Sequence, residues 1–265
     1  MLAKLFISLV RISPSFQKAV WKWWYQRLGK RGHDIGWTFM NYGFTPDNKE
    51  QSPNLKPEDE SNRMFIQLYD YAASQIPLDG LKVLEVGSGR GGGASFIARY
   101  YNPKSMTGLD YSPSAVKLSN SVHEEVSNLD FVEGDAENLP FEDKSFDIIT
   151  IAFGFRNISN QDKALQEFNR ILKNKGKLLI LEFSQPQSKF FGMLYKFYSY
   201  KIMPKVASLI TKKYAYEYLP ESIDMFSSRE EIKNKLEFNQ FRNVEINDMT
   251  FGISTIFSGF KNDKE

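Results

Sequence analysis

The glycine-rich segment LEVGSGRGGG, residues 84–93, places the strongest constraint on how this chain can fold. It follows a short apolar run and precedes ASFIARY, which has a helical pattern. A glycine-rich turn between a strand and a helix lets the backbone approach a bound ligand closely. The spacing of Gly87, Gly89 and Gly92 fits the G-x-G-x-x-G of dinucleotide sites, whereas Gly87, Gly89 and Gly91 fit the G-x-G-x-G of an S-adenosylmethionine site. The glycines alone leave both ligand classes open.

Strand-like and helix-like segments alternate around this turn. We expect strands at 82–86, 105–109, 129–133, 146–152 and 177–183, and helices at 91–101, 113–126 and 161–173. This alternation predicts a parallel sheet with helices on both faces. Two last strands, near 244–248 and 253–260, have no helix between them and predict an antiparallel hairpin at the sheet edge. A dinucleotide dehydrogenase would usually continue with a further parallel half.

Other segments flank this α/β region. The first 30 residues read as two helices split near Pro14, and residues 31–57 are rich in Gly, Pro and Asn, which predicts an irregular segment. Further helices are expected at 57–76, in an aromatic insertion at 186–220 and near 228–238. We therefore divide the chain into an N-terminal segment, 1–56, and an α/β domain, 57–265.

Composition narrows the chemistry. The 265 residues include no cysteine, which excludes disulfides, thiolate metal sites and cysteine nucleophiles. The two histidines, His33 and His123, are far apart in sequence, so we expect no metal site and a surface position for His123. No apolar run approaches the roughly 18 residues of a membrane span. The N-terminal sequence MLAKLFISLVRIS, interrupted by Arg11, lacks a small-residue cleavage site, and we expect a cytoplasmic protein.

Positive charge is concentrated in two segments. Residues 1–34 contain seven basic residues against one acid, and residues 189–216 contain six lysines and no acid, although the whole chain carries a net charge of only +2. Both segments are also aromatic, as WKWWY and KFFGMLYKFYSY show. Basic residues mixed with aromatic ones suit an anionic membrane surface, so we expect peripheral contact with the inner face of a membrane. The acidic remainder argues against nucleic acid as a partner, and an oligomer stays open.

Three acidic residues bear on the choice of cofactor. Glu85 stands two residues before Gly87, where it can order the glycine loop or meet a cationic ligand but would repel a pyrophosphate. Asp110 ends the next strand, where an acid can hold the ribose hydroxyls of either cofactor. Asp135 follows the third strand, within reach of an adenine amino group. These features argue against a dinucleotide.

The order of these motifs resembles that of the class I S-adenosylmethionine-dependent methyltransferases. LEVGSGRGGG, GLDYSP, EGDAENLPFEDKSFD and the terminal hairpin fit the family's pattern over about residues 60–265. The resemblance implies a Rossmann-like α/β fold: a seven-stranded, mostly parallel sheet with an antiparallel last strand, N-terminal helices and a helical insertion after the fifth strand. It implies an enzyme that binds S-adenosyl-L-methionine through Glu85, Gly87, Ser88, Gly89, Gly91, Asp110, Tyr111, Asp135, Ala136 and Phe153. Close packing of helix on strand is the better explanation for Gly92 and Gly93.

Two parts of the chain resemble two different subfamilies. From IAFGFRN (151–157) onward, including YEYLPESIDMF and MTFGISTIFSGFK, the chain resembles the C-methyltransferases of menaquinone and ubiquinone synthesis. The stretch from WKWWYQRL through FMNYGF to GDAENLPF resembles methyltransferases of mycobacterial type that methylate a hydroxyl of long-chain phthiotriol lipids. The leading hypothesis is therefore C-methylation of a demethylated polyprenyl quinol, and the alternative is O-methylation of a lipid alcohol or phenol. A third hypothesis is a cofactor-binding, membrane-associated protein without catalysis.

The same resemblance suggests residues for the acceptor side, where the N-terminal segment would act as a lid or membrane contact. Direct attack on a sulfonium methyl group needs no covalent nucleophile, only position and desolvation. Arg156 and Asn157 directly follow the fourth strand, and Arg156 could stabilise a developing phenolate while Tyr218 orients the ring. Glu182, at the end of the fifth strand, is either an acceptor-site acid or a partner for Arg156. The lack of a placed histidine base favours an acidic quinol over an aliphatic alcohol.

Overall fold

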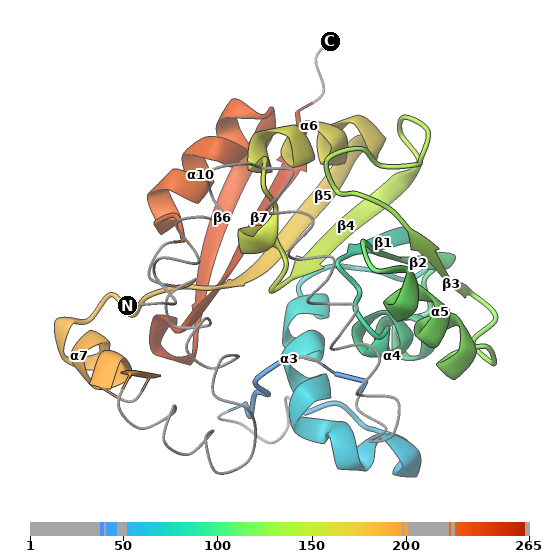
Figure 1. Ribbon diagram of the computed structural model, residues 1–265, viewed down its shortest axis with the longest axis horizontal. Helices are drawn as coiled ribbons and strands as arrows, with labels where there is room; N and C mark the ends of the chain where they lie inside the picture. The colour runs from blue at the N-terminus through green and yellow to red at the C-terminus, as the bar shows by residue number, and fades with distance from the viewer. Residues whose placement is uncertain are drawn as a thin grey trace.

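The computed structural model of the chain describes residues 38–39, 41–46, 52–197, 199–200, 223 and 226–262. Within them, a seven-stranded sheet has the order β3-β2-β1-β4-β5-β7-β6 (Figure 1). The strands are β1 Lys82–Val86, β2 Ser105–Asp110, β3 Leu129–Glu133, β4 Phe146–Ala152, β5 Leu172–Phe183, β6 Phe241–Met249 and β7 Ser254–Lys261. The helices and turns are η3 Pro57–Asn62, α3 Arg63–Ala73, α4 Gly92–Tyr100, α5 Pro113–Val122, η4 Phe155–Asn157, α6 Gln161–Ile171, α7 Lys189–Phe197, α10 Arg229–Phe238 and η6 Thr250–Gly252.

Strand directions confirm the predicted sheet. The first five strands pair in parallel, and β7 lies antiparallel to both β5 and β6. The strand order reverses between β1 and β4, because the chain builds outward to β3 on one side and then returns to the centre. In open α/β sheets a crevice forms at this switch point, outside the carboxyl ends of the strands. The fold therefore predicts a ligand site at the ends of β1 and β4.

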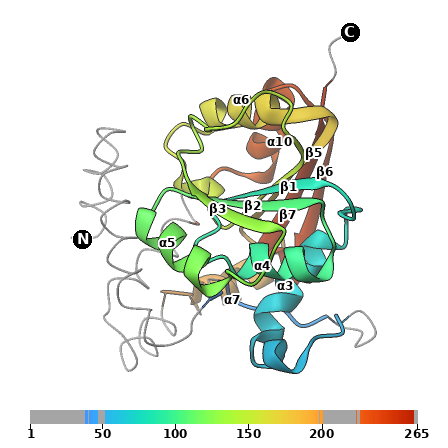
Figure 2. The same cartoon turned by 90° about the vertical axis from the view of Figure 1, so that its right-hand side faces the viewer.

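Alternation along the strands builds two apolar cores, one on each face of the sheet. Leu178 and Ile180 of β5 belong to the core under α6 and α10, whereas Leu179 and Leu181 belong to the core under α3 and α4. Figure 2 shows these two helical layers above and below the sheet. Burial of both faces explains why the strands read as nearly continuous apolar runs.

Capping residues account for the accurately predicted helix starts. Ser112 Oγ accepts a hydrogen bond from the N–H of Ala115 at the start of α5, and Pro113 occupies the first helical position. At the start of α10, Ser228 and Glu231 form a reciprocal capping box. Both capping signals lie within three residues of the helix start, so the sequence alone indicates them.

Several element boundaries differ from the expectation. The strand β5 begins at Leu172 rather than at 177, because its pairing with β4 shifts between Phe146 and Ile148. The helix expected over 57–76 is a 3₁₀ turn followed by α3, and α5 ends at Val122 rather than at 126. The two helices expected around Pro14, and the part of the insertion beyond residue 200, lie outside the described residues. Among the helices that the structure describes, none is long and apolar enough to cross a membrane.

Candidate active site

A cleft of about 130 Å³ opens at the carboxyl ends of the central strands. The residues that line it are Val86, Gly87, Leu109, Asp110, Tyr111, Gly134, Asp135, Ala136, Glu137, Ile151, Gly154, Asn157, Ile158 and Ser159. They come from the ends of β1, β2 and β4, from the segment after β3 and from η4 with its following residues. The cleft thus lies at the switch point of the sheet.

The cleft brings together six of the predicted site residues: Gly87, Asp110, Tyr111, Asp135, Ala136 and Asn157. Glu85, Ser88, Gly89, Gly91, Phe153 and Arg156 are not part of its lining. Tyr218 lies outside the described residues. Sequence reasoning missed Glu137 and Ser159, although both follow a predicted residue by two positions, in DAE and NIS respectively. A turn at a strand end places several successive residues at one cleft, and that is the signal that could have found them.

The glycine loop directs its own N–H groups into the protein. The N–H groups of Gly87 and Ser88 both donate to the carbonyl oxygen of Leu109, at 2.7 and 3.0 Å. The N–H of Gly89 donates to Asp110 Oδ2 at 2.8 Å. A pyrophosphate site needs such N–H groups free to point at the ligand. The N–H groups of Gly87, Ser88 and Gly89 are therefore not free to bind a pyrophosphate, while Gly87, with φ +73 and open space beside its Cα, still leaves room for close approach.

Glu85 is buried at the end of β1, against the first turn of α4. Its side chain is only 1% exposed and accepts hydrogen bonds from the Tyr69 hydroxyl and from the N–H of Ala94 in the first turn of α4. Burial raises the pKa of Glu85 to about 8. Among the described residues, its Oε2 has no hydrogen-bond partner. Because its pKa is about 8, Glu85 is mostly protonated at neutral pH, so it orders the glycine loop through its hydrogen bonds and adds little charge to the site.

Asp110 is held rigidly where the sequence placed it, at the end of β2. Its two carboxylate oxygens accept hydrogen bonds from the N–H groups of Gly89 and Ser112, each at 2.8 Å. Burial raises the pKa of Asp110 to about 6. The fixed carboxylate lines the cleft and retains lone pairs that can accept hydrogen bonds from ribose hydroxyls.

The rest of the lining is acidic as well. Asp135 Oδ1 accepts a hydrogen bond from the N–H of Glu137, and Glu137 Oε1 accepts one from the N–H of Asn160. Among the described residues, the lining holds three carboxyl groups, on Asp110, Asp135 and Glu137, and no lysine or arginine. A cleft of this charge favours a cationic ligand such as a sulfonium over a phosphorylated one. Asp110 and the acidic rim therefore fit S-adenosylmethionine.

Two glycines of the loop serve packing. A Cβ on Gly91 would lie 2.4 Å from the Phe131 ring, and one on Gly93 would lie 2.1 Å from the Tyr69 ring. His123 packs beside Gly91, with its ring 5.8 Å from that of Phe131 and its Nε2 3.2 Å from the Arg90 carbonyl oxygen. His123 is half-buried rather than fully on the surface, because its ring packs against Phe131 and the carbonyl of Arg90 at the glycine loop. Burial lowers the pKa of this imidazole.

Arg156 forms an ion pair with Glu182. The guanidinium Nη1 donates to Glu182 Oε1 and, at 2.7 Å, to the carbonyl oxygen of Phe153. Glu182 Oε2 also accepts the backbone N–H of Arg156 at 3.0 Å. Glu182 is fully buried, so of the two roles expected for it, the structure shows the partner of Arg156. The pair ties the turn η4, which carries Asn157, to the end of β5.

An aromatic cluster stands beside the cleft. Phe153 has φ +57, and its ring lies 4.6 Å from that of Phe183 and 5.7 Å from that of Tyr42, measured between ring centroids. The Tyr42 hydroxyl lies 2.6 Å from Ser254 Oγ at the start of β7. The N-terminal segment 41–46 therefore reaches the carboxyl end of the sheet, next to Gly154 of the cleft.

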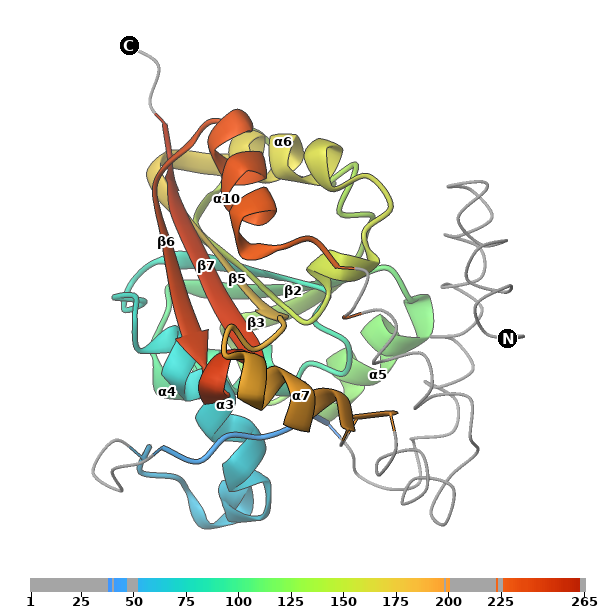
Figure 3. The same ribbon diagram turned by 90° about the vertical axis from the view of Figure 1, so that its left-hand side faces the viewer.

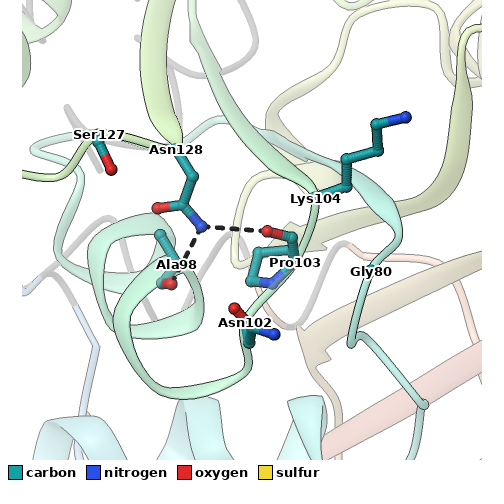
Figure 4. Close-up of a pocket in the computed structure, with 7 residues that line it drawn as sticks. All are labelled: Gly80, Ala98, Asn102, Pro103, Lys104, Ser127 and Asn128. Atoms are coloured by element: carbon teal, nitrogen blue, oxygen red, sulfur yellow. Dashed lines mark hydrogen bonds between the residues drawn. The ribbon is translucent and has the colours of Figure 1, made fainter.

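A second hollow lies at the opposite end of the parallel strands, beside their amino ends (Figure 4). Its volume is about 600 Å³, and it is lined by Gly80, Ala98, Asn102, Pro103, Lys104, Ser127 and Asn128. The side chain of Asn128 donates to the carbonyl oxygens of Ala98 and Pro103, at 3.3 and 3.1 Å. This groove joins loops at the amino ends of β1, β2 and β3 and has none of the acids of the first cleft.

Comparisons with known proteins agree with this geometry. The sequence model of the ubiE/COQ5 methyltransferase family matches residues 68–261. The chain belongs to this family. It is an S-adenosylmethionine-dependent methyltransferase, and S-adenosylmethionine is its cofactor.

Individual relatives and structures give the extent of the likeness. The enzyme is 41% identical over 187 residues to a ubiquinone/menaquinone biosynthesis C-methyltransferase UbiE of Shewanella pealeana, covering 69% of this chain and 74% of that protein. The corresponding protein of Shewanella oneidensis gives the same figures. The crystal structure of the [4+2]-cyclase SpnF covers 94% of this chain and 97% of its own, with a TM-score of 0.69 and 17% identity. A methyltransferase structure from Aquifex aeolicus has a TM-score of 0.54, 18% identity and coverage of 78% and 98%. These two structures share the fold.

Proposed function

We propose that this methyltransferase methylates a ring carbon of a demethylated polyprenyl quinol. The observation that carries the proposal is the 41% identity to C-methyltransferases of ubiquinone and menaquinone biosynthesis, which extends over most of both chains. The curated relatives reported above are C-methyltransferases, so methylation of a lipid hydroxyl is the weaker alternative.

The cofactor supplies an electrophilic methyl group on a sulfonium. The protein's part is to hold this cation beside Asp110, Asp135 and Glu137 and to keep water away from the reacting atoms. For a quinol, loss of the hydroxyl proton moves negative charge onto the vacant ring carbon, which would form the new carbon–carbon bond as the methyl–sulfur bond breaks and its electron pair stays on sulfur, leaving a neutral thioether. The ring hydrogen then leaves as a proton, and aromaticity is restored.

We place the acceptor ring between the cofactor cleft and the aromatic cluster of Tyr42, Phe153 and Phe183. Asn157 lines the cleft and can donate a hydrogen bond to a quinol oxygen. Arg156 lies beside it, held by Glu182 with its guanidinium carbon 5.2 Å from the centre of the Phe183 ring. In this proposal Arg156 positions Asn157 and stabilises phenolate charge through water, and Tyr218 orients the ring.

The test is methyl transfer by the purified full-length protein. Cofactor labelled in its methyl group is incubated with a reduced short-chain demethylmenaquinol, or with a long-chain lipid alcohol, in detergent. We expect label on the quinol ring and none on the alcohol. Asp110→Asn should weaken cofactor binding about tenfold or more, because an amide cannot accept both backbone hydrogen bonds.

A matched control is Asp79→Asn, which makes the same chemical change before β1, at the opposite edge of the sheet. Label on the alcohol alone would establish the alternative. Cofactor binding without transfer to either acceptor would indicate the non-catalytic hypothesis.

A polyprenyl acceptor resides in a membrane, and we propose that the enzyme works at its surface. Support comes from the sequence, since residues 1–34 and 189–216 combine excess basic charge with aromatic side chains.

A further inference from the structure

The helix α7 presents its apolar side to solvent. At about 100° of rotation per residue, four large apolar side chains fall on a single stripe. They are Phe190, Met193, Leu194 and Phe197, with exposed fractions of 61%, 64%, 46% and 59%. The other side of the helix, at Gly192 and Tyr195, is the half-buried one. A helix on a protein in water normally has the reverse arrangement, so this stripe marks an interaction surface.

The turn η6 adds another exposed aromatic ring. Phe251 is 75% exposed, and its ring stacks on that of Phe191 of α7, with the centroids 4.9 Å apart and the planes at 11°. Thr250 and Phe251 have φ of +48 and +57, a region that β-branched and bulky residues rarely adopt. Backbone strain that holds an aromatic side chain out in solvent points to a function for that side chain.

A polar cluster holds this turn against the base of α7. Arg229 donates to Asp248 Oδ1 at 2.7 Å, to the carbonyl oxygen of Gln185 at 2.8 Å and to that of Gly252 at 3.0 Å. Ser184 Oγ donates to the Gly252 carbonyl oxygen at 2.9 Å. The stripe, Phe191 and Phe251 therefore form one preformed surface, here called the α7–η6 surface. Figure 3 shows α7 and the turn side by side at the ends of β6 and β7.

The charge of this region identifies the kind of partner. The sequences 183–200 and 249–262, from which the surface is built, contain no aspartate or glutamate. Lys196 is exposed on α7, and the segment 189–216 carries six lysines. Two copies meeting here would bring together two helices that carry Lys196 and no acid, whereas anionic headgroups would complement this charge. Aromatic and basic residues together suit the interface of a bilayer.

We propose that the α7–η6 surface docks on an anionic phospholipid bilayer, with the stripe and Phe251 in the headgroup region. The α7–η6 surface and the cofactor cleft lie at the same end of the strands, because β5 ends there and β7 begins there. A lipid acceptor would then enter at the docked edge. The inference rests on the proposed work at a membrane surface and names the face that makes the contact, while docking itself needs neither acceptor nor cofactor.

The absence of cysteine makes the test direct. Met193→Cys in the full-length protein, labelled with an environment-sensitive fluorophore, is mixed with vesicles of phosphatidylcholine containing phosphatidylglycerol. We expect a blue shift and brighter emission, and little change with phosphatidylcholine alone. The matched control is Phe238→Cys at the end of α10. Phe238 is 75% exposed, as Phe251 is, but it lies at the opposite end of the strands, just before β6 begins.

Flotation with the same vesicles provides a second measurement. The double variant Phe190→Asn and Phe251→Asn should bind about tenfold less protein, since two interfacial aromatics are lost. Phe238→Asn should bind as the wild type does, and circular dichroism checks that each variant is folded. Unchanged emission at position 193 while the protein floats would overturn the proposal. A blue shift of the emission that occurs without vesicles and grows with protein concentration would also overturn the proposal, because it would indicate a contact between two copies of the protein.

Discussion

Glu85 is the residue whose ionisation depends most strongly on the fold. In an unfolded chain its carboxyl would have the ordinary glutamate pKa of 4.5, whereas burial raises the pKa of Glu85 to about 8 in the folded protein. Between these values the folded state binds more protons than the unfolded state. The stability that this difference confers is complete at low pH and is lost as pH rises from about 4.5 through about 8.

Glu85→Gln should remove this pH dependence. The variant carries no titrating group at the position, so the stability of the wild type relative to the variant should fall steadily as pH rises through that window. Urea unfolding at a series of pH values measures the difference. Asp130→Asn, at an exposed carboxyl on β3, is the control and should leave the wild-type pH dependence intact. Parallel curves for the wild type and Glu85→Gln would contradict the buried, protonated state.

The ion pair of Arg156 and Glu182 makes a separate prediction. Arg156→Ala leaves a fully buried carboxylate without its cation and should lower the free energy of unfolding by about 3–5 kcal/mol. The double variant Arg156→Ala and Glu182→Ala should recover part of this loss, because the buried charge is also removed. Denaturant unfolding compares the three proteins. A stable Arg156→Ala variant that has lost turnover would show instead that the guanidinium acts mainly on the acceptor.

Residues at strand ends were the most predictable part of the site. Gly87, Asp110 and Asp135 each follow an apolar strand within a recognisable motif, and the parallel sheet brings those ends together. The carboxyl of Glu85 was expected near the loop, but its bond to Tyr69 of α3 was not readable, since no local pattern relates the two residues. The packing of His123 against the glycine loop was not predicted for the same reason.

At the scale of elements, α4 and α7 show how one substitution can have opposite effects. Gly93→Ala would place a methyl group 2.1 Å from the Tyr69 ring and should destabilise the protein by about 1–3 kcal/mol. Gly192→Ala meets no heavy atom closer than 3.7 Å and should stabilise it by up to about 1 kcal/mol, because alanine is the better helix former. Thermal unfolding of the two variants measures both. Equal effects would contradict the tight contact of α3 with α4.

The sequence predicts whether a segment is a helix or a strand, because the spacing of its apolar residues is a local pattern. It does not always predict where the helix or strand begins and ends. The early start of β5 depends on how its residues pair with β4, across a register shift that the sequence of β5 alone does not announce. The sequence likewise does not predict that the apolar side of α7 faces solvent. An aromatic helical segment predicts burial just as well as exposure, and only the packing of the surrounding elements decides between them.

At the scale of the whole molecule, Tyr42 connects two distant parts of the chain. Its hydroxyl meets Ser254 at 2.6 Å across 212 positions of sequence, and its ring packs on Phe153 and Phe183. The seven mostly parallel strands with an antiparallel last strand followed from the family resemblance. The contact of Tyr42 with the start of β7 did not, because no sequence signal relates the two residues.

Tyr42→Ala should therefore affect the acceptor and not the cofactor. We expect the KM for the quinol to rise about tenfold, while the affinity for S-adenosylmethionine stays at the wild-type value. Tyr42→Phe keeps the ring and loses one hydrogen bond, worth about 1 kcal/mol, so its effect should be smaller. Steady-state kinetics and cofactor titration separate the two quantities. Equal losses in both would show that Tyr42 supports the cofactor cleft instead.

The most direct test of the central claim follows the hydrogen that the reaction must release. A demethylated quinol is prepared with deuterium on its vacant ring carbon and is incubated with the enzyme and S-adenosylmethionine, and the product is analysed by mass spectrometry. Methylation of carbon predicts a product that has gained a methyl group and lost the deuterium to water. A methylated product that keeps the deuterium would contradict the account, because the methyl group would then be on oxygen.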